Sequence, residues 1–216
     1  MSGVLVVISG FSGSGKGTMV SRLLQKYSDH YALSISATTR QPREGEQEGV
    51  HYFFRTVEEF EAMIAADELI EYAKFVNNYY GTPRAYVEEQ LLAGKSVILE
   101  IEIQGALQIK EKYPEVKLVF VTPPSAKELQ QRLIGRGTEA AEVIEKRMHR
   151  AVEEAAFMKK YDYLIVNDEL EIAVEEFHRI IEAERSGQTG EIAYLRTAAN
   201  GELIHDIRED LELSGE

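Results

Sequence analysis

Short runs of apolar residues recur along the chain with few polar residues inside them. The four clearest runs are residues 4–9, 96–101, 116–121 and 163–166. Runs of this length, rich in Val, Ile and Leu, are typical of parallel strands that are buried on both faces. The pattern therefore predicts a parallel β-sheet at the centre of the fold.

Segments with helical periodicity lie between and after these runs. The segment that follows the first run is apolar at Met19, Val20, Leu23 and Leu24, which predicts a helix. Further helices are predicted at residues 106–112, 125–134, 139–160 and 170–185. The alternation of strands and helices indicates an α/β fold with a doubly wound parallel sheet.

Residues 34–94 interrupt this alternation. They begin with a polar stretch, SISATTRQPREGEQEG, which is followed by the strand-like HYFF and by a predicted helix at residues 57–66. We interpret this region as a small inserted lobe of about 60 residues, near the lower limit for a domain.

Residues 187–216 change character again. They are acidic and carry glycines at positions 187, 190, 201 and 215. This composition predicts either a short hairpin around Asn200 and Gly201 or a flexible tail.

Composition narrows the class of protein. The chain has 216 residues, 44% of them hydrophobic, which is enough for one sizeable core, and it has no cysteine. No apolar run approaches the roughly 18 residues of a membrane helix, and no basic stretch precedes the first run, so we expect a cytoplasmic protein without a membrane anchor. The net charge of -13 argues against a general nucleic-acid surface.

A glycine-rich loop joins the first predicted strand to the first predicted helix. Its sequence, GFSGSGKGT, has the spacing of a phosphate-binding loop, and strand, loop and helix follow in the required order. Backbone N–H groups at a helix N-terminus bind anions, and Lys16 is predicted to reach the β- and γ-phosphates of ATP. The predicted ATP-phosphate site comprises Gly10, Phe11, Ser12, Gly13, Ser14, Gly15, Lys16, Gly17 and Thr18.

The acceptor of the phosphate has to be sought in the inserted lobe. Arg40 and Arg43 lie close together in its polar loop, and two guanidinium groups suit a phosphate dianion, although a solvated loop would also carry them. Glu71 follows an apolar pair, so it is either a buried carboxylate that needs donors or a partly exposed residue at a helix end.

At this point the chain resembles the guanylate kinase family. The resemblance rests on SISATTRQPREGEQEGVHYFF, LIEYAKFVNNYYGT, LEIEIQGA, GFSGSGKGT and YDYLIVND, in that family's order, and runs from about residue 4 to 185. It implies the P-loop nucleoside-monophosphate kinase fold for residues 1–186. The core would be residues 1–33, 95–125 and 156–186, with a GMP-binding lobe at 34–94 and a lid at 126–155. Residues 187–216 would form an acidic tail of unknown role.

The resemblance further implies phosphorylation of GMP, and of dGMP, to the diphosphate with ATP and Mg²⁺. Ser36, Glu71 and Thr82 would lie at the guanine edge. The GMP phosphate would be held by Arg40, Arg43, Tyr52 and Tyr80, with Gly81 allowing close approach of the backbone. A carboxylate at Glu71 accepts guanine N1–H and N2–H together, a donor pair that adenine lacks.

Two acidic residues depart from the family's usual Asp-x-Asp. Glu100 would lie on the guanine or ribose side, and Glu102 near the water shell of the magnesium, with Thr18 as the second candidate for contact with the metal. The end of a parallel strand is where α/β sheets place ligands, which supports both positions.

The lid and the adenine end are assigned by the same resemblance. Arg136 and Arg147 are predicted to be catalytic, reaching over the phosphates when the lid closes. For the neighbouring Arg132 and Arg150 we favour surface pairing with nearby Glu. The pair Asn167 and Asp168 is predicted to flank the adenine.

Two other functions stay open on the sequence alone. A related kinase with a sugar-phosphate acceptor would leave Glu71 and Ser36 without a purpose. A peptide-binding module of guanylate-kinase-like fold would be expected to lack parts of the phosphate loop, whereas Lys16, Arg40 and Arg136 are all present.

Overall fold

A five-stranded parallel sheet forms the core of the protein. The computed structural model describes residues 3–75, 77–135 and 141–214. The strand order is β2-β7-β1-β8-β9, and every neighbouring pair is parallel. The strands are β1 (Leu5–Gly10), β2 (Tyr31–Leu33), β7 (Ser96–Glu100), β8 (Lys117–Thr122) and β9 (Tyr163–Val166). The predicted parallel sheet is confirmed, and β2, with three residues, is the strand that the apolar pattern missed.

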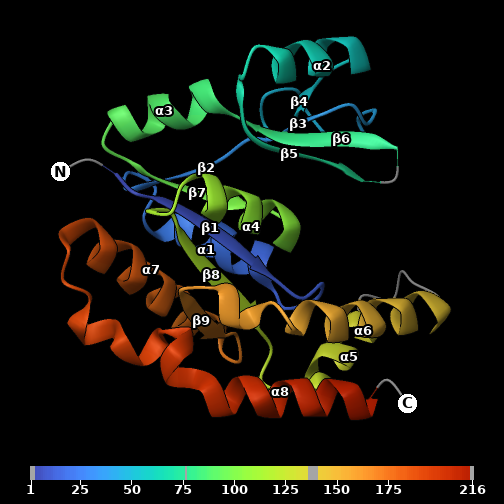
Figure 1. Ribbon diagram of the computed structural model, residues 1–216, viewed down its shortest axis with the longest axis vertical. Coiled ribbons are helices and arrows are strands. Elements are labelled where there is room, and N and C mark those ends of the chain that lie inside the picture. The colour runs from blue at the N-terminus through green and yellow to red at the C-terminus, as the bar shows by residue number, and fades with distance from the viewer. Residues whose placement is uncertain (1–2, 76, 136–140, 215–216) are drawn as a thin grey trace.

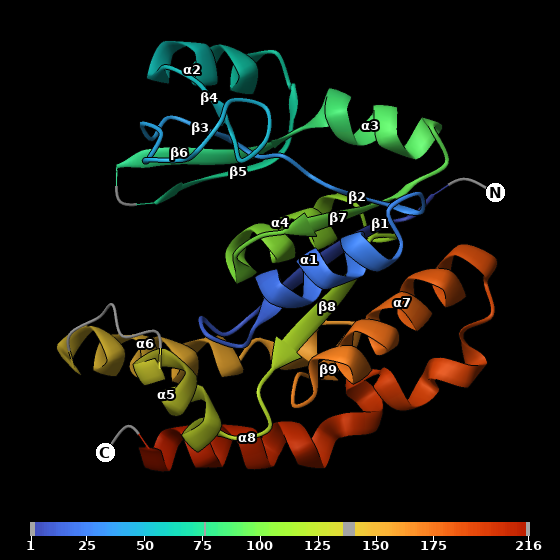
Figure 2. The same cartoon turned by 180° about the vertical axis from the view of Figure 1, so that it is seen from behind.

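Helices cover both faces of this sheet. On one face α1 (Lys16–Lys26) and α7 (Leu170–Ser186) pack over Val6 and Ile8. On the other face α3 (Arg84–Leu92) and α4 (Ile103–Lys112) pack over Val7. Figures 1 and 2, seen from opposite sides, bring α4 and α1 to the front in turn. Alternate residues of β1 thus enter opposite layers of core, as expected for a strand buried on both faces.

The inserted lobe is a separate four-stranded sheet with one covering helix. The order is β4-β3-β6-β5, comprising β3 (Ala37–Thr38), β4 (Phe53–Phe54), β5 (Leu69–Phe75) and β6 (Asn78–Pro83). The helix α2 (Val57–Ala65) begins with a capping box between Thr56 and Glu59, and its Phe60 packs with Ala37 and Leu69. The lobe stands beside the core as one block (Figure 1).

The described part of the predicted lid, residues 126–155, contains the helices α5 (Ala126–Gly135) and α6 (Ala141–Ala155). A single helix was predicted over residues 139–160, and this prediction is wrong at its end. The chain leaves α6 at Ala155 and forms the 3-10 turn η1 (Met158–Lys160), because Met158 and Tyr161 turn inward and are buried in the core. Residues 136–140, which include Arg136, lie outside the described part of the chain.

The C-terminal segment is helical, so the predicted hairpin around Asn200 and Gly201 is wrong. After the 3-10 turns η2 (Thr189–Leu195) and η3 (Thr197–Asn200), helix α8 (Gly201–Ser214) begins at Gly201. Its Ile204, Ile207 and Leu211 recur at helical spacing and are buried in the cluster that contains the lid and sheet residues. Helix α8 packs against α5 and α6, as Figures 1 and 2 show.

No helix in the described part of the chain combines the length and the apolar character that crossing a bilayer requires.

Helix α8 is predicted to stabilise the fold through its buried face. Leu211 is 1% exposed and Leu213 is 75% exposed in the same helix. We expect Leu211→Ala to lower the free energy of unfolding by about 2–4 kcal/mol, because it leaves a cavity. The matched change Leu213→Ala is expected to cost under about 0.5 kcal/mol. Urea unfolding measures both, and equal effects would contradict the packing of α8.

Candidate active site

The carboxyl ends of three core strands bring the predicted donor-site residues to one edge of the sheet. The phosphate loop follows β1, Glu100 ends β7, and Asn167 follows β9. Because β7, β1, β8 and β9 are parallel, these ends lie at the same edge. This edge is the usual position of a ligand in an α/β sheet.

The phosphate loop is tightly fitted to the strand beside it. Gly10 has φ 150°, and a Cβ at that position would lie 2.0 Å from the carbonyl oxygen of Val121. Helix α1 then begins at Lys16, whose Nζ donates to the carbonyl oxygens of Gly10 (2.7 Å) and Phe11 (3.0 Å). These bonds hold the ammonium group against the start of the loop. A helix N-terminus, a positive charge and a glycine-rich turn therefore coincide, which is the arrangement of an anion site.

Thr18 and Glu100 lie on the side of the loop where α1 begins. Gly17 and Thr18 are exposed in the first turn of α1. A Cβ on Gly17 would lie 3.6 Å from Oε1 of Glu100, so this carboxylate faces the start of the helix. Desolvation raises the pKa of Glu100, and the charge of Lys16 opposes that rise.

The lid helix α6 reaches the phosphate loop through Arg147. Nη1 of Arg147 donates to the hydroxyl of Ser12. The structure thus places this predicted catalytic residue beside the loop, while Arg136 lies outside the described residues.

Arg150 links Glu102 to the lid. Its guanidinium pairs with Glu102 at 2.6 Å and with Glu154 at 2.8 Å. Pairing of Arg150 with glutamates agrees with the sequence-based expectation. Burial raises the pKa of the Glu154 carboxyl, and Arg150 opposes the shift.

Glu71 is the buried carboxylate of the lobe. It lies on β5, is 9% exposed, and its Oε1 accepts a 2.7 Å hydrogen bond from the hydroxyl of Thr82 on β6. Burial raises the pKa of Glu71, and hydrogen bonds from Thr82 lower it. The alternative of a partly exposed Glu at a helix end is therefore wrong, because the residue is buried in a strand that packs against α4.

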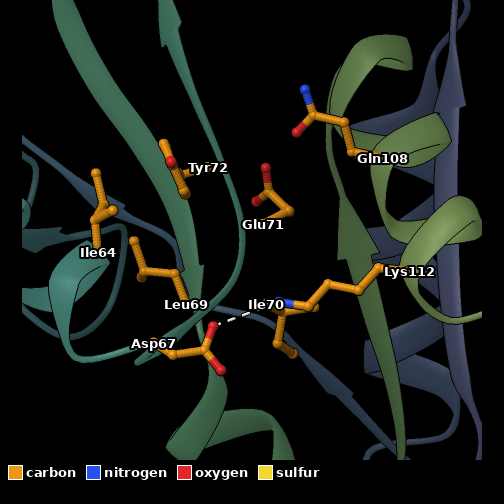
Figure 3. Close-up of a pocket in the computed structure, with 8 residues that line it drawn as sticks. All are labelled: Ile64, Asp67, Leu69, Ile70, Glu71, Tyr72, Gln108 and Lys112. Carbon is orange, nitrogen blue, oxygen red and sulfur yellow. Dashed lines mark hydrogen bonds and ion pairs between the residues drawn. The ribbon is translucent and has the colours of Figure 1, made fainter.

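Glycine at position 105 makes room for this carboxylate. A Cβ on Gly105, in α4, would lie 3.0 Å from Oε2 of Glu71. Figure 3 shows the Glu71 side chain between β5 and α4, on the side where Gln108 lies. Helix α4 thus approaches the carboxylate closely enough that only a glycine fits without displacement.

A cavity of about 300 Å³ opens next to Glu71 between the lobe and α4 (Figure 3). Its lining comprises Ile64, Asp67, Leu69, Ile70, Glu71, Tyr72, Gln108 and Lys112. Asp67 and Lys112 form an ion pair across it at 3.4 Å. Of the residues predicted to bind GMP, Glu71 lines this cavity, and the rest of that set lies elsewhere in the lobe and core.

Arg40 is held by a carboxylate that the sequence analysis did not single out. Its Nη1 and Nη2 donate to the two oxygens of Glu46 at 3.0 and 2.8 Å, and its guanidinium stands 5.3 Å from the centre of the Tyr52 ring. Arg43 donates its backbone N–H to Glu46 at 2.7 Å. Hydrogen bonds from Arg40 and from the Arg43 backbone lower the pKa of Glu46 to about 2.

The remaining predicted GMP residues lie around this pair. Tyr80 approaches Tyr52 edge-on with ring centres 6.2 Å apart, and it interacts with Arg40. A Cβ on Gly81 would lie 2.8 Å from the carbonyl oxygen of Glu71, so packing within the lobe already requires glycine there. Ser36 is half-buried, at the chain crossing into β3.

Three functional candidates were missed or misjudged from the sequence: Glu46, Gly105 and Arg132. Glu46 lies six residues after Arg40 in the polar loop, and Gly105 stands inside an amphipathic pattern, which is a signal of close approach. Arg132 pairs with Glu128 as expected, but Nη1 also donates to the carbonyl oxygen of Asn167 at 2.8 Å. No spacing rule predicts a contact between residues so distant in sequence.

Comparisons with known proteins agree with the family resemblance. Residues 2–184 match the family model for guanylate kinase. The chain is 54% identical over 182 residues to a guanylate kinase of Halalkalibacterium halodurans, covering 84% of this chain and 89% of that protein. It is 48% identical over 204 residues to one of Streptococcus thermophilus, covering 94% and 98%. The crystal structure of guanylate kinase from Anaplasma phagocytophilum aligns with a TM-score of 0.67 at 34% identity, covering 85% of this chain and 86% of that one.

Glu71 is predicted to destabilise the folded protein as its carboxyl ionises. Below the unfolded-state pKa of about 4.3 the group is protonated in both states, so it has no linkage effect. Because burial raises its folded pKa, stability is lost as pH rises above that value. The loss is about 1.4 kcal/mol for each unit of pKa elevation.

We therefore expect Glu71→Gln to raise the free energy of unfolding at pH 8 and to have little effect near pH 4. Urea titrations at both pH values measure the difference. The matched control is Glu68→Gln, whose side chain is exposed one residue before β5. A gain that is the same at both pH values would contradict the assignment.

Proposed function

The chain belongs to the guanylate kinase family and phosphorylates GMP with ATP, and we propose that the buried Glu71 selects the guanine base. The observation that carries this proposal is the Glu71–Thr82 bond inside the lobe. A carboxylate that is 9% exposed needs donors, and guanine N1–H and N2–H supply two. Adenine presents no such donor pair and would bury the carboxylate with no donor from the base.

Ser36 is then the better donor to the guanine O6 atom. A hydroxyl has one proton to donate, and the Thr82 proton is committed to Glu71. Ser36 lies at the start of the lobe, half-buried and next to β3. In this assignment Thr82 fixes the carboxylate, while Ser36 and Glu71 read the base. Glu100 would face the guanine or ribose side from the end of β7.

Arg40, Arg43, Tyr52 and Tyr80 are proposed to hold the GMP phosphate. Arg40 engages Glu46 through its two terminal nitrogens, which fixes the plane of the guanidinium. The rings of Tyr52 and Tyr80 lie on the same side of the lobe. We assign Gly81 to the same wall, where its backbone lies close to the bound nucleotide.

The donor ATP is proposed to bind along the phosphate loop. Backbone N–H groups of residues 10–18 would surround the phosphates, with Lys16 neutralising charge. Arg147 and Arg136 would supply further positive charge from the lid in the transition state, which the contact of Arg147 with Ser12 supports for the first of them. Asn167 and Asp168 would flank the adenine.

Magnesium fits the donor set around the loop. The described residues hold no cluster of three or more His, Cys, Asp or Glu side chains that would enclose a metal. Mg²⁺ commonly keeps several waters and binds through one or two protein oxygens plus substrate phosphates. Thr18 and Glu102 offer hard oxygen atoms of that kind, and Glu100 faces the same turn. When bound, the ion would neutralise charge on the transferred phosphoryl group.

No protein nucleophile is required for the reaction. An oxygen of the GMP phosphate attacks the γ-phosphorus of ATP, the bond from that phosphorus to the bridging oxygen breaks, and ADP leaves with the electron pair. The protein contributes positioning and positive charge. Closure of the lobe and lid would exclude water that competes for the phosphoryl group.

The setting of the enzyme is also a proposal. We place its activity in the cytoplasm on free nucleotides, because the net charge of -13 disfavours a nucleic-acid surface and the chain has no cysteine. We include dGMP among its acceptors, since the assigned groups face mainly the base and the phosphate. The lobe and lid roles of residues 34–94 and 126–155 belong to the same proposal.

An acceptor panel tests the proposed selectivity. With ATP as donor, we expect turnover with GMP and dGMP and little with AMP or ribose bisphosphate in a coupled assay. Discrimination of about 10⁴ between guanine and adenine is typical of a site that reads a polar group. Equal turnover of AMP and GMP would overturn the role of Glu71.

Glu71→Gln is predicted to weaken GMP binding selectively. The amide presents N–H donors toward guanine donors, so we expect KM for GMP to rise about 100-fold, with KM for ATP changed by less than about twofold. The control Glu68→Gln is expected to leave both constants unchanged. Steady-state kinetics with each substrate varied in turn gives the comparison, and a parallel rise of both KM values would contradict the placement at guanine.

A further inference from the structure

The carbonyl oxygen of Ser14, in the middle of the phosphate loop, is held by a hydrogen bond from a side chain outside the loop. Nδ2 of Asn167 donates to it at 2.8 Å, and Asn167 is 5% exposed. The contact is so close that a Cβ on Gly15 would lie 2.4 Å from the same Nδ2. Asn167 was predicted at the adenine, whereas here its side chain binds the loop itself.

This hydrogen bond fixes the direction of the backbone N–H group of Gly15. In a trans peptide the C=O and the following N–H point in opposite directions. A Ser14 carbonyl held toward Asn167 therefore turns the N–H of Gly15 to the opposite side of the loop. Gly15 has φ 85°, which a glycine adopts without penalty and other residues do not. The orientation of the Gly15 N–H, one of the anion-binding donors, thus depends on the hydrogen bond from Asn167 to Ser14.

Arg132, in helix α5, contacts the same carbonyl group of Ser14. Its Nη1 donates to the carbonyl oxygen of Asn167 at 2.8 Å and reaches that of Ser14 at 3.5 Å. Its Nε donates to Glu128 at 2.8 Å, one turn earlier in α5. The guanidinium therefore joins the loop, the end of β9 and α5 at one point.

Helix α5 is itself fixed against the loop and at its start. A Cβ on Gly13 would lie 2.9 Å from Leu133 and 3.3 Å from Leu129, so the helix leaves no space over the loop. The backbone N–H of Ala126, at the first residue of α5, donates to Asp210 of α8 at 2.7 Å. Through these contacts α8 supports the helix that carries Arg132.

We propose that Arg132 is a positioning residue for the donor site, which holds the Ser14 carbonyl with Asn167 so that the loop keeps its anion-binding shape before ATP arrives. The inference rests on the proposed function, in which this loop binds the phosphates of ATP. In this role Arg132 acts on the loop through the carbonyl groups of Asn167 and Ser14.

Donor binding by Arg132→Ala and Arg132→Lys tests the proposal. Loss of a partly buried hydrogen bond from a charged group corresponds to about tenfold or more in affinity, so we expect Arg132→Ala to weaken ATP binding by about 10–100-fold. We expect KM for GMP to stay within about twofold. Arg132→Lys keeps the charge but not the planar fork, so partial recovery is expected. The control is Lys127→Ala, an exposed cation on the same helix.

Calorimetry with ATP and with inorganic pyrophosphate separates a loop effect from a base contact. A loop that has lost its shape binds both ligands more weakly, by a similar factor. Weaker binding of ATP with unchanged binding of pyrophosphate would mean that Arg132 acts on the base, and the proposal would be overturned. Unchanged binding of both would overturn it as well. Circular dichroism confirms that each variant is folded, and Arg132→Lys serves if Arg132→Ala is not.

Lys16→Ala distinguishes failure of this inference from failure of the proposed function. If Lys16→Ala keeps normal ATP binding and turnover, the loop is not the donor site and the proposed function fails at that point. If Lys16→Ala loses both while Arg132→Ala binds ATP normally, only the positioning role of Arg132 is wrong.

Discussion

Parallel pairing of β1 with β7 and β8 is the constraint on which the rest of the structure depends. Because the strands run the same way, their carboxyl ends meet at one edge, and the connections must cross the faces as helices. The phosphate loop, Glu100 and Asn167 are far apart in sequence yet share that edge. The helices that cover the faces bury both sides of β1, which fixes the position of the phosphate loop that follows it.

Two carboxylates in the lobe show how environment divides chemical roles. Glu46 is pinned by Arg40 and by a backbone N–H, and its pKa is lowered to about 2, so it stays charged. Glu71 is buried with a neutral hydroxyl as its partner, and its pKa is raised. The charge of Glu46 is thus compensated by groups of the protein itself. Glu71 accepts hydrogen bonds from the hydroxyl and backbone of Thr82 and lies beside a cavity, which suits a site where a ligand adds further donors.

The core of the fold was predictable because its signals are local. Four apolar runs predicted four of the five core strands, and the glycine loop lies between a strand and a helix, β1 and α1, as predicted. In the lobe, β5 and β6 were missed because LIEYAKF and NYYGTP lack the strict alternation of a half-buried strand. Helix α8 was missed because the segment is mostly acidic and was judged by its composition. Its buried residues Ile204, Ile207 and Leu211 nevertheless have helical spacing. For the site, the resemblance supplied the residues. The contact of Arg132 with Asn167 arises from tertiary proximity that a single sequence does not show, and the contact of Glu46 with Arg40 depends on how one polar loop folds.

The packing of α8 has a consequence for where the molecule can bend. Its buried residues share a core cluster with α5, α6 and strand residues of the sheet. A rotation of both lid helices away from the sheet would expose that shared cluster, and it would drag the C-terminal helix with it. The inserted lobe has a small cluster of its own, built around Phe60, and it also contributes Ile70 of β5 to the shared cluster. A turn of the lobe would separate Ile70 from the core but keep the Phe60 cluster intact, whereas a rotation of α5 and α6 would also displace α8, so flexing costs least at the junctions of the lobe.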